Sequence, residues 1–173
     1  YADLKRAKVW SMSGDPVADI TFKALDIQPF SIPLTDTYTS LQTGLINTTY
    51  APPLGALTLF WFKKQKYYID INLAYASGGV VIDKKTWSDV SPAHQAIINQ
   101  LADTYFTKFN QVGRKANEDS KTVLLKEGLS RVEMKDMSPF TKAGETAKKE
   151  ALGKLYDQET LNLLNKLIKE VRK

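Results

Sequence analysis

The segment between Ser91-Pro92 and Gly128 constrains this chain more than any other. Serine followed by proline opens a helix, and Gly128 is the next residue suited to end one. Between them apolar residues recur every three or four positions, at Ile97, Leu101, Tyr105, Phe109, Val112 and Ala116. A continuous helix of roughly 36 residues would be about 54 Å long, which exceeds the diameter of a small domain. The helix therefore bridges two lobes, pairs with another chain, or is interrupted near Gly113.

The N-terminal half alternates strand-like and helix-like segments. In chain order the predicted elements are a strand at 7–12, a helix at 16–25, a strand at 27–32, a helix at 34–44, a strand at 45–50 and an apolar, buried helix at 54–62. Asp15 is suited to cap the first helix, with Pro16 in its first turn, and Gly44 is suited to end the second. This order predicts an α/β fold with a parallel or mixed sheet covered by helices.

The C-terminal half is richer in helix. After an extended run at 67–82 comes the long helix, then a strand at 128–133, a helix at 138–155 and a final helix capped by Asp157. We therefore expect an α/β unit, one long helix and further C-terminal helices.

The candidate binding site follows from this order of elements. In such sheets, ligands bind beyond the carboxyl ends of the strands. We therefore expect a cleft near the strand ends, lined by Trp10, Ser11, Ser13, Leu34, Tyr50, Ala51 and Tyr75. The turn at Gly14 and Asp15 also places a helix N-terminus there, which attracts anions, although the charge of Asp15 opposes them.

Composition argues against several other functions. The absence of cysteine removes disulfides, Cys-ligated zinc, iron–sulfur clusters and a thiol nucleophile. His94, the one histidine, falls in the first turn of the long helix, where we expect it to be exposed. We predict no catalytic residue, no metal ligand and no cofactor, so the chain is not expected to be an enzyme. No run approaches the roughly 20 consecutive apolar residues that cross a bilayer.

The net charge of +5 comes from 24 basic and 19 acidic side chains. The surplus lies in the helical second half, where acids are interleaved with it. A nucleic-acid surface would instead cluster its lysines and arginines. We therefore predict solvated helix faces and no nucleic-acid partner.

Several motifs together resemble one family. They are KVW at 8–10, QPFSIPLTDTYTSLQTGLIN at 28–47, YAPP at 50–53, VVIDKKTW at 80–87 and SPAHQ at 91–95. The chain resembles the DctP-type solute-binding proteins of TRAP (tripartite ATP-independent periplasmic) transporters over nearly its whole length. The resemblance implies a type II periplasmic-binding-protein-like fold, in which two α/β lobes close over an organic acid. It also implies a periplasmic or lipid-anchored receptor, made with a signal peptide, that delivers its solute to membrane permease subunits.

Family members are about twice as long as this chain, so we expect a fragment of a longer receptor. The resemblance implies three parts: a second α/β lobe at 1–75, an interlobe strand and long connecting helix at 76–128, and a returning strand with C-terminal helices at 129–173. The first lobe is expected to be absent.

The resemblance also implies changes at the ligand site. Trp10 stands where the family has an arginine that pairs with the ligand carboxylate. Leu34 replaces a ring that packs near the ligand, Ala51 replaces an asparagine, and Tyr50 occupies an acidic position. A less polar ligand with a larger apolar body is therefore predicted.

A second interpretation belongs to a different class. The long helix and an open sheet edge could serve an assembly module that forms a homodimer and binds no small ligand. Light scattering separates this alternative from a monomeric receptor.

Overall fold

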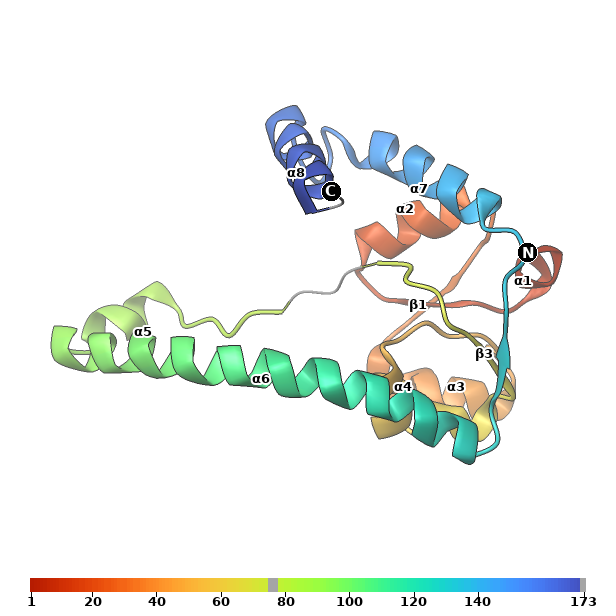
Figure 1. Ribbon diagram of the computed structural model, residues 1–173, viewed down its shortest axis with the longest axis horizontal. Coiled ribbons are helices and arrows are strands. Elements are labelled where there is room, and N and C mark those ends of the chain that lie inside the picture. Colours follow the sequence, from red (N-terminus) through yellow and green to blue (C-terminus); the bar gives the residue numbers. More distant parts are fainter. Residues whose placement is uncertain (75–77, 172–173) are drawn as a thin grey trace.

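The computed structural model describes residues 1–74 and 78–171 (Figure 1). Its helices are α1 (Ala2–Arg6), α2 (Pro16–Ala24), α3 (Thr37–Thr43), α4 (Pro53–Thr58), α5 (Lys84–Asp89), α6 (Pro92–Lys126), α7 (Ser138–Ala151) and α8 (Gln158–Val171). Its strands are β1 (Trp10–Met12), β2 (Phe30–Ile32), β3 (Tyr67–Ile69) and β4 (Ser130–Val132). Two 3₁₀ turns, η1 (Leu34–Asp36) and η2 (Trp61–Lys64), complete the elements.

The strands form two short parallel pairs. β1 pairs with β2, with Met12 opposite Ile32 at their carboxyl ends. On its other side β1 is extended by a parallel bridge between Val9 and Thr48. β3 pairs with β4 in the second sheet. The predicted α/β class, with helices covering a sheet, is therefore confirmed.

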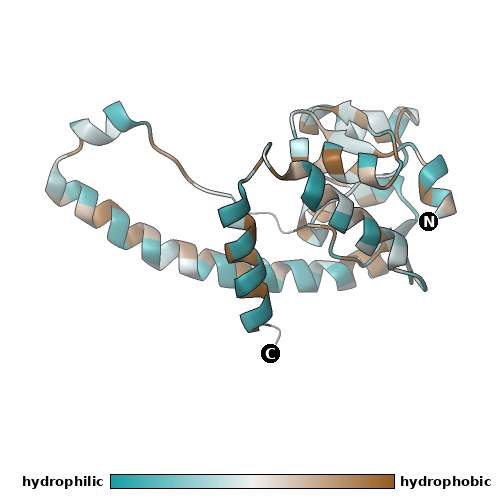
Figure 2. Ribbon diagram, turned by 90° about the horizontal axis from the view of Figure 1, so that it is seen from above, coloured by the Kyte–Doolittle hydropathy of each residue, from teal (hydrophilic) through white to brown (hydrophobic). Residues whose placement is uncertain are grey.

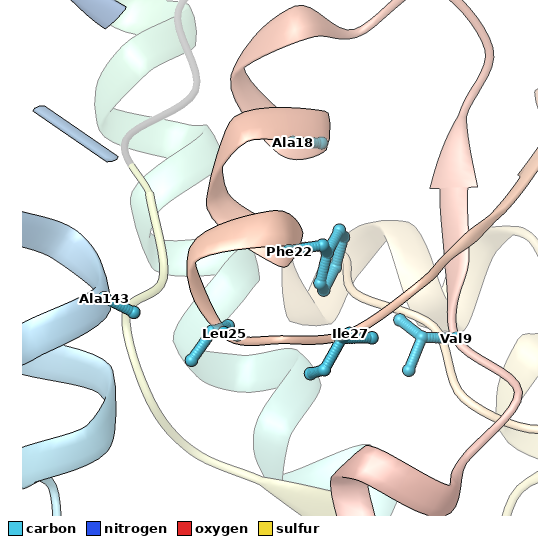
Figure 3. Packing of buried hydrophobic residues seen from close by; sticks show 6 residues of the cluster. All are labelled: Val9, Ala18, Phe22, Leu25, Ile27 and Ala143. Carbon is cyan, nitrogen blue, oxygen red and sulfur yellow. The ribbon is translucent and has the colours of Figure 1, made fainter. Parts of the chain in front are cut away.

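The core lies on both faces of the β1 sheet because successive side chains of a strand point to opposite faces. Val9 points to one face and packs with Phe22 of α2 and Ala143 of α7 (Figure 3). Trp10 points to the other face and packs with Leu41 of α3 and with Trp61, whose ring centroid lies 5.1 Å away. Helices α2 and α7 therefore cover one face, and α3 with η2 covers the other.

Local signals placed several helix boundaries correctly. The Asp15 carboxylate accepts hydrogen bonds from the backbone N–H groups of Val17 and Ala18, at 3.1 and 3.0 Å, and so caps α2. Gly44 ends α3 in the left-handed conformation at φ 74°. Asp157 accepts from the N–H of Thr160 at the start of α8. Each of these caps was predicted, because each is decided within one turn of helix.

Two predictions near the middle of the chain are wrong. The strand predicted at 45–50 reduces to the single bridge at Thr48. The buried helix predicted at 54–62 is divided into α4, which has no buried residue, and η2. The division falls at Phe60, whose positive φ of 58° ends the helix and turns Trp61 into the core.

The extended run predicted at 67–82 is also too long. Regular strand is confined to Tyr67–Ile69, and the described residues that follow, up to Asp83, belong to no helix or strand. Helices α1 and α5, which were not predicted, are short. The N-terminal one is tied to the lobe by the Tyr1 hydroxyl, which donates to the Leu25 carbonyl at 2.7 Å.

Helix α6 is one continuous rod of 35 residues, and Gly113 does not interrupt it. Its length is about 52 Å at 1.5 Å per residue. The C-terminal end packs against α4, while the N-terminal end projects beyond the lobe and carries α5 (Figure 2). We call residues 78–112 the arm. The predicted interruption near Gly113 is therefore wrong. The other two outcomes, that the helix bridges two lobes or pairs with another chain, stay predictions.

The returning segment divides in two. Helix α7 packs on α2, and Glu150 pairs with Lys23 at 2.7 Å across that contact. Helix α8 stands away from the lobe, and none of its side chains is buried (Figure 1). Residues 138–151 thus share a core with the N-terminal lobe.

Candidate functional site

The carboxyl ends of β1 and β2 meet at one edge of the sheet. The Ser31 hydroxyl, one residue before the end of β2, donates to the Ser13 hydroxyl at 3.3 Å, and the Ser13 N–H donates to the Ile32 carbonyl at 3.4 Å. Ser13 is exposed, and Gly14 beside it turns the chain into α2 with φ 80°. This edge therefore presents hydroxyl groups to solvent at the point where sequence placed the cleft.

Trp10 and Ser11 lie beneath this edge. Only 3% of Trp10 is exposed, and its indole N–H donates to the Ile32 carbonyl at 2.9 Å. Ser11 is fully buried and donates to the Asp19 carboxylate at 3.3 Å. In this structure both residues support the edge from within the lobe and offer a solute little or no surface. The prediction of a less polar ligand depended in part on an apolar Trp10 side chain in the cleft. That side chain is buried and does not line the edge.

Tyr50 connects the two faces of the core to the edge. Its ring lies 5.2 Å from the ring of Trp10 and 5.5 Å from that of Phe22, measured between centroids. Its hydroxyl donates to the second Asp15 carboxylate oxygen at 3.3 Å. Burial raises the pKa of the Tyr50 phenol, and the Asp15 charge acts in the same direction. Tyr50 is therefore a neutral hydrogen-bonding group across the physiological pH range.

The other predicted site residues occupy different positions. Leu34 begins η1 just after β2 and is 45% exposed, and Ala51 is exposed between Tyr50 and the proline pair. Both therefore adjoin the edge along the chain. Tyr75 lies outside the described residues.

Carboxylates at this edge were not among the predicted site residues. Asp15 takes two of the free N–H groups at the start of α2, so its own side chain occupies the anion-attracting end of that helix. Asp19 lies one turn further on and holds Ser11. The spacing of four residues was a usable signal, because it places both carboxylates on one side of a helix.

Other features lie away from this edge. An open hollow of about 520 Å³ runs along α8 and is lined by Asn162, Asn165, Lys166, Lys169 and Glu170. One helix cannot enclose a solute, so we attach no binding role to it.

His94 is exposed, as predicted, and its backbone N–H donates to the Ser91 hydroxyl at 3.4 Å. Within residues 1–74 and 78–171, no group of acidic or histidine side chains is arranged to hold a metal ion. Across that same span, no helix combines the length and the apolar character needed to cross a bilayer.

The arm carries an exposed apolar surface. We call it the arm stripe, and its members on α6 are Ile97, Ile98, Leu101, Tyr105, Phe106, Phe109 and Val112. Val80, Val81 and Ile82 are also exposed, and Phe109 is 70% exposed. Brown, hydrophobic segments recur along α6 in Figure 2. Apolar surface of this extent is typical of a contact with another folded unit.

Comparison with solved structures defines the fold. A TRAP periplasmic solute-binding protein from Xanthobacter autotrophicus Py2, with bound β-D-galacturonate, matches with a TM-score of 0.81 and 18% identity over 95% of this chain and 54% of that one. One from Fusobacterium nucleatum, with bound sn-glycerol-3-phosphate, matches with a TM-score of 0.79 and 18% identity over 99% and 56%. The chain therefore has the type II periplasmic binding fold of these receptors.

The family follows from the sequence match. Residues 1–159 match the family of bacterial extracellular solute-binding proteins, family 7, known as DctP. The chain belongs to this family, which confirms the resemblance drawn from its motifs. Its fold and family are those of periplasmic solute-binding receptors and not of enzymes.

The chain is shorter than its relatives. An uncharacterised protein of Haemophilus influenzae is 29% identical over 106 residues, which are 61% of this chain and 32% of that protein. The chain thus spans about a third of this relative and about half of the solved structures.

Proposed function

We propose that this chain supplies one lobe and the connecting helix of a receptor that binds a small organic acid, or a more apolar carboxylate-bearing ligand. The receptor delivers this solute to TRAP membrane permease subunits. The observation that carries the proposal is the family match over residues 1–159, which includes all four strands of the described chain. Proteins of this family work with membrane permeases, which supports the delivery step.

The solute is proposed to bind at the edge formed by β1, β2 and Tyr50. Hydroxyl groups there, from Ser13, Ser31 and Tyr50, can both donate and accept hydrogen bonds. Asp15 only accepts while ionised, and it repels a carboxylate. We therefore orient the ligand with its hydroxyl-bearing or apolar end toward this lobe and its acid group away from Asp15. Leu34 supplies the apolar contact, and Ala51 follows Tyr50 in the chain.

Trp10 and Ser11 belong to the proposed site as supports. Each holds an edge residue in place from below, through the Ile32 carbonyl and Asp19 respectively. Tyr75 stays in the proposal on the strength of its sequence position alone. The two solved structures described above, from Xanthobacter autotrophicus and Fusobacterium nucleatum, each hold an acid that also carries hydroxyl groups. This favours the same ligand class here.

The division into lobes is proposed on the same basis. Residues 1–75 form most of one lobe, residues 76–128 provide the connection, and residues 129–173 return to the lobe. The arm stripe then packs against a second lobe that this chain does not include. Seven large apolar side chains exposed on one helix support a partner of this size.

Calorimetric titration of the longest natural gene product tests the binding proposal. The probes are D-galacturonate and sn-glycerol-3-phosphate, with D-galactose and glycerol as matched neutral compounds. We expect at least one acid to bind and its neutral match to bind at least tenfold more weakly. Tyr50→Phe should weaken binding by about three- to tenfold, the usual worth of one hydrogen bond. Thr39→Ala, on an exposed part of α3, is the matched control. Equal affinity for acids and neutral compounds would contradict the assignment.

A homodimer is the second candidate, and the arm stripe is again the feature that favours it. In that case two copies of this chain bury the stripe against each other, and no small ligand is bound. Light scattering of the 173-residue chain decides, with Phe109→Glu as the test variant. A monomer at all concentrations rules out the dimer, whereas a dimer that Phe109→Glu dissociates supports it.

A further inference from the structure

Three segments of the chain meet where the arm joins the lobe. The chain leaves the lobe after β3, returns along α6, and continues through β4 toward α7 (Figure 1). Asp70 is the first residue after β3. Its carboxylate contacts the other two segments, α6 and β4.

The contacts of Asp70 form a small ion-pair network. One carboxylate oxygen lies 3.2 Å from the Lys121 ammonium of α6, and the other lies 3.6 Å from a guanidinium nitrogen of Arg131 in β4. Lys121 also pairs with Glu118 at 3.3 Å. The neighbouring Asp70 carboxylate is the main cause that raises the pKa of Lys121. One carboxylate thus joins β3, α6 and β4.

The network is partly shielded from water. The side chains of Asp70 and Lys121 are 26% and 28% exposed. Isolated surface ion pairs contribute little, but several charges in one partly buried network hold a defined geometry. A contribution to geometry is therefore expected here even where the contribution to stability is small.

Neighbouring contacts on α6 hold the helix against the lobe. Leu124 is buried against Phe62 and Leu129, and Asn117 accepts a hydrogen bond from the Leu54 N–H at 3.0 Å. Burial of Leu124 is not directional, so it resists separation more than rotation. The Lys121 ammonium lies between these two contacts along α6 and pairs with Asp70 just after β3. This pair therefore limits how far the rod tilts.

We propose that Asp70 is a positioning residue that sets the angle between the arm and the lobe. In the receptor described above the arm reaches the second lobe, so this angle determines how far the cleft opens. That functional consequence rests on the proposed function, whereas the angle itself does not.

The length of α6 amplifies a change in angle. From Lys121 to Pro92 the helix rises about 43 Å at 1.5 Å per residue. A tilt of about 10° at Lys121 moves the far end by about 8 Å and Gln100 by about 5.5 Å. Shifts of this size are measurable between two spin labels.

Pulsed electron paramagnetic resonance on the 173-residue chain tests the proposal. The chain has no cysteine, so Gln42→Cys on α3 and Gln100→Cys on α6 give two clean labelling sites, both exposed. In this background Asp70→Asn should shift or broaden the label-to-label distance by about 3–5 Å, following the lever estimate above. Asp119→Asn is the matched control, because Asp119 pairs with Lys115 inside α6 at 3.2 Å and should leave the distance unchanged.

Circular dichroism at 222 nm shows whether each variant keeps its helices. A folded Asp70→Asn variant with the distance distribution of the parent chain overturns the proposal. If Asp70→Asn does not fold, Lys121→Gln removes the α6 side of the network and is read by the same criterion. Ligand titration is not involved, so failure of this angle test and failure of the receptor proposal are separate results.

Discussion

Replacement of Gly113 by alanine should stabilise the protein. Gly113 lies inside α6, and a Cβ built on it would meet no atom within 4 Å. Alanine is about 1 kcal/mol better than glycine in a helix interior, because it loses less backbone entropy on folding. With no clash to offset this gain, the free energy of unfolding should rise by about 0.5–1 kcal/mol.

Gly128 provides a matched control for this substitution. A Cβ there also meets nothing within 4 Å, but the backbone has φ 96°. Alanine pays about 1–2 kcal/mol for such a conformation, so Gly128→Ala should destabilise the protein. The two variants add the same methyl group to open space and differ only in the backbone angle.

Urea denaturation followed at 222 nm gives both free energies by linear extrapolation. Hydrogen exchange of the amides at 105–112 checks that the gain from Gly113→Ala lies in the arm. Loss of stability in Gly113→Ala, with an unchanged m-value, would refute the continuous helix and favour a break near Gly113.

Three further predictions concern the lobe. Leu124→Ala should lower the free energy of unfolding by about 2–4 kcal/mol in urea, because it leaves a cavity between Phe62 and Leu129; a loss below about 1 kcal/mol would contradict the anchoring role of Leu124. Asp15→Ala should cost about 1 kcal/mol in the same assay, since it removes the cap of α2, whereas Asp15→Asn should retain most of it. Lys23 lowers the pKa of Glu150 below its usual 4.5, so the stability from this pair is present above that pH and is lost as the pH falls through the lower folded pKa. Melting temperatures between pH 7 and 3 should therefore fall less steeply for Glu150→Gln, and an unchanged slope would show that the pair is not formed.

Sequence predicted the features that are decided locally. The cap at Asp15, the left-handed end at Gly44 and the Ser91-Pro92 start of α6 each depend on side chains within one turn. The helix break at Phe60 could not be found in this way. Its positive φ accompanies the burial of Trp61 beside Trp10, a contact between residues 51 positions apart in the chain.

The carboxyl ends of β1 and β2 lie where the sequence predicted them. The burial of Trp10 and Ser11 beneath these ends was not predicted. Trp10 and Ser11 follow one another in β1 and both are buried, because helices cover both faces of the sheet. Period-two alternation distinguishes inside from outside only where one face meets water. A strand covered on both sides gives no such signal, so Trp10 was expected at the ligand surface.

The two ends of helix α6 have different surroundings. All 35 of its residues are described, and the buried ones are Ser120 and Leu124, both in its C-terminal third. Folding of the lobe therefore accounts for Leu124, whereas the arm stripe is exposed in the part of the chain that the structure describes. An apolar stripe at helical spacing lowers the free energy only when it is covered, since exposed it gains nothing from burial. The lobe supplies a fixed end at Asp70 and Lys121, and the stripe needs a second folded unit. In the proposed receptor that unit is the second lobe, and α6 is then a rod fixed at one end and covered at the other, as a connection between two lobes requires.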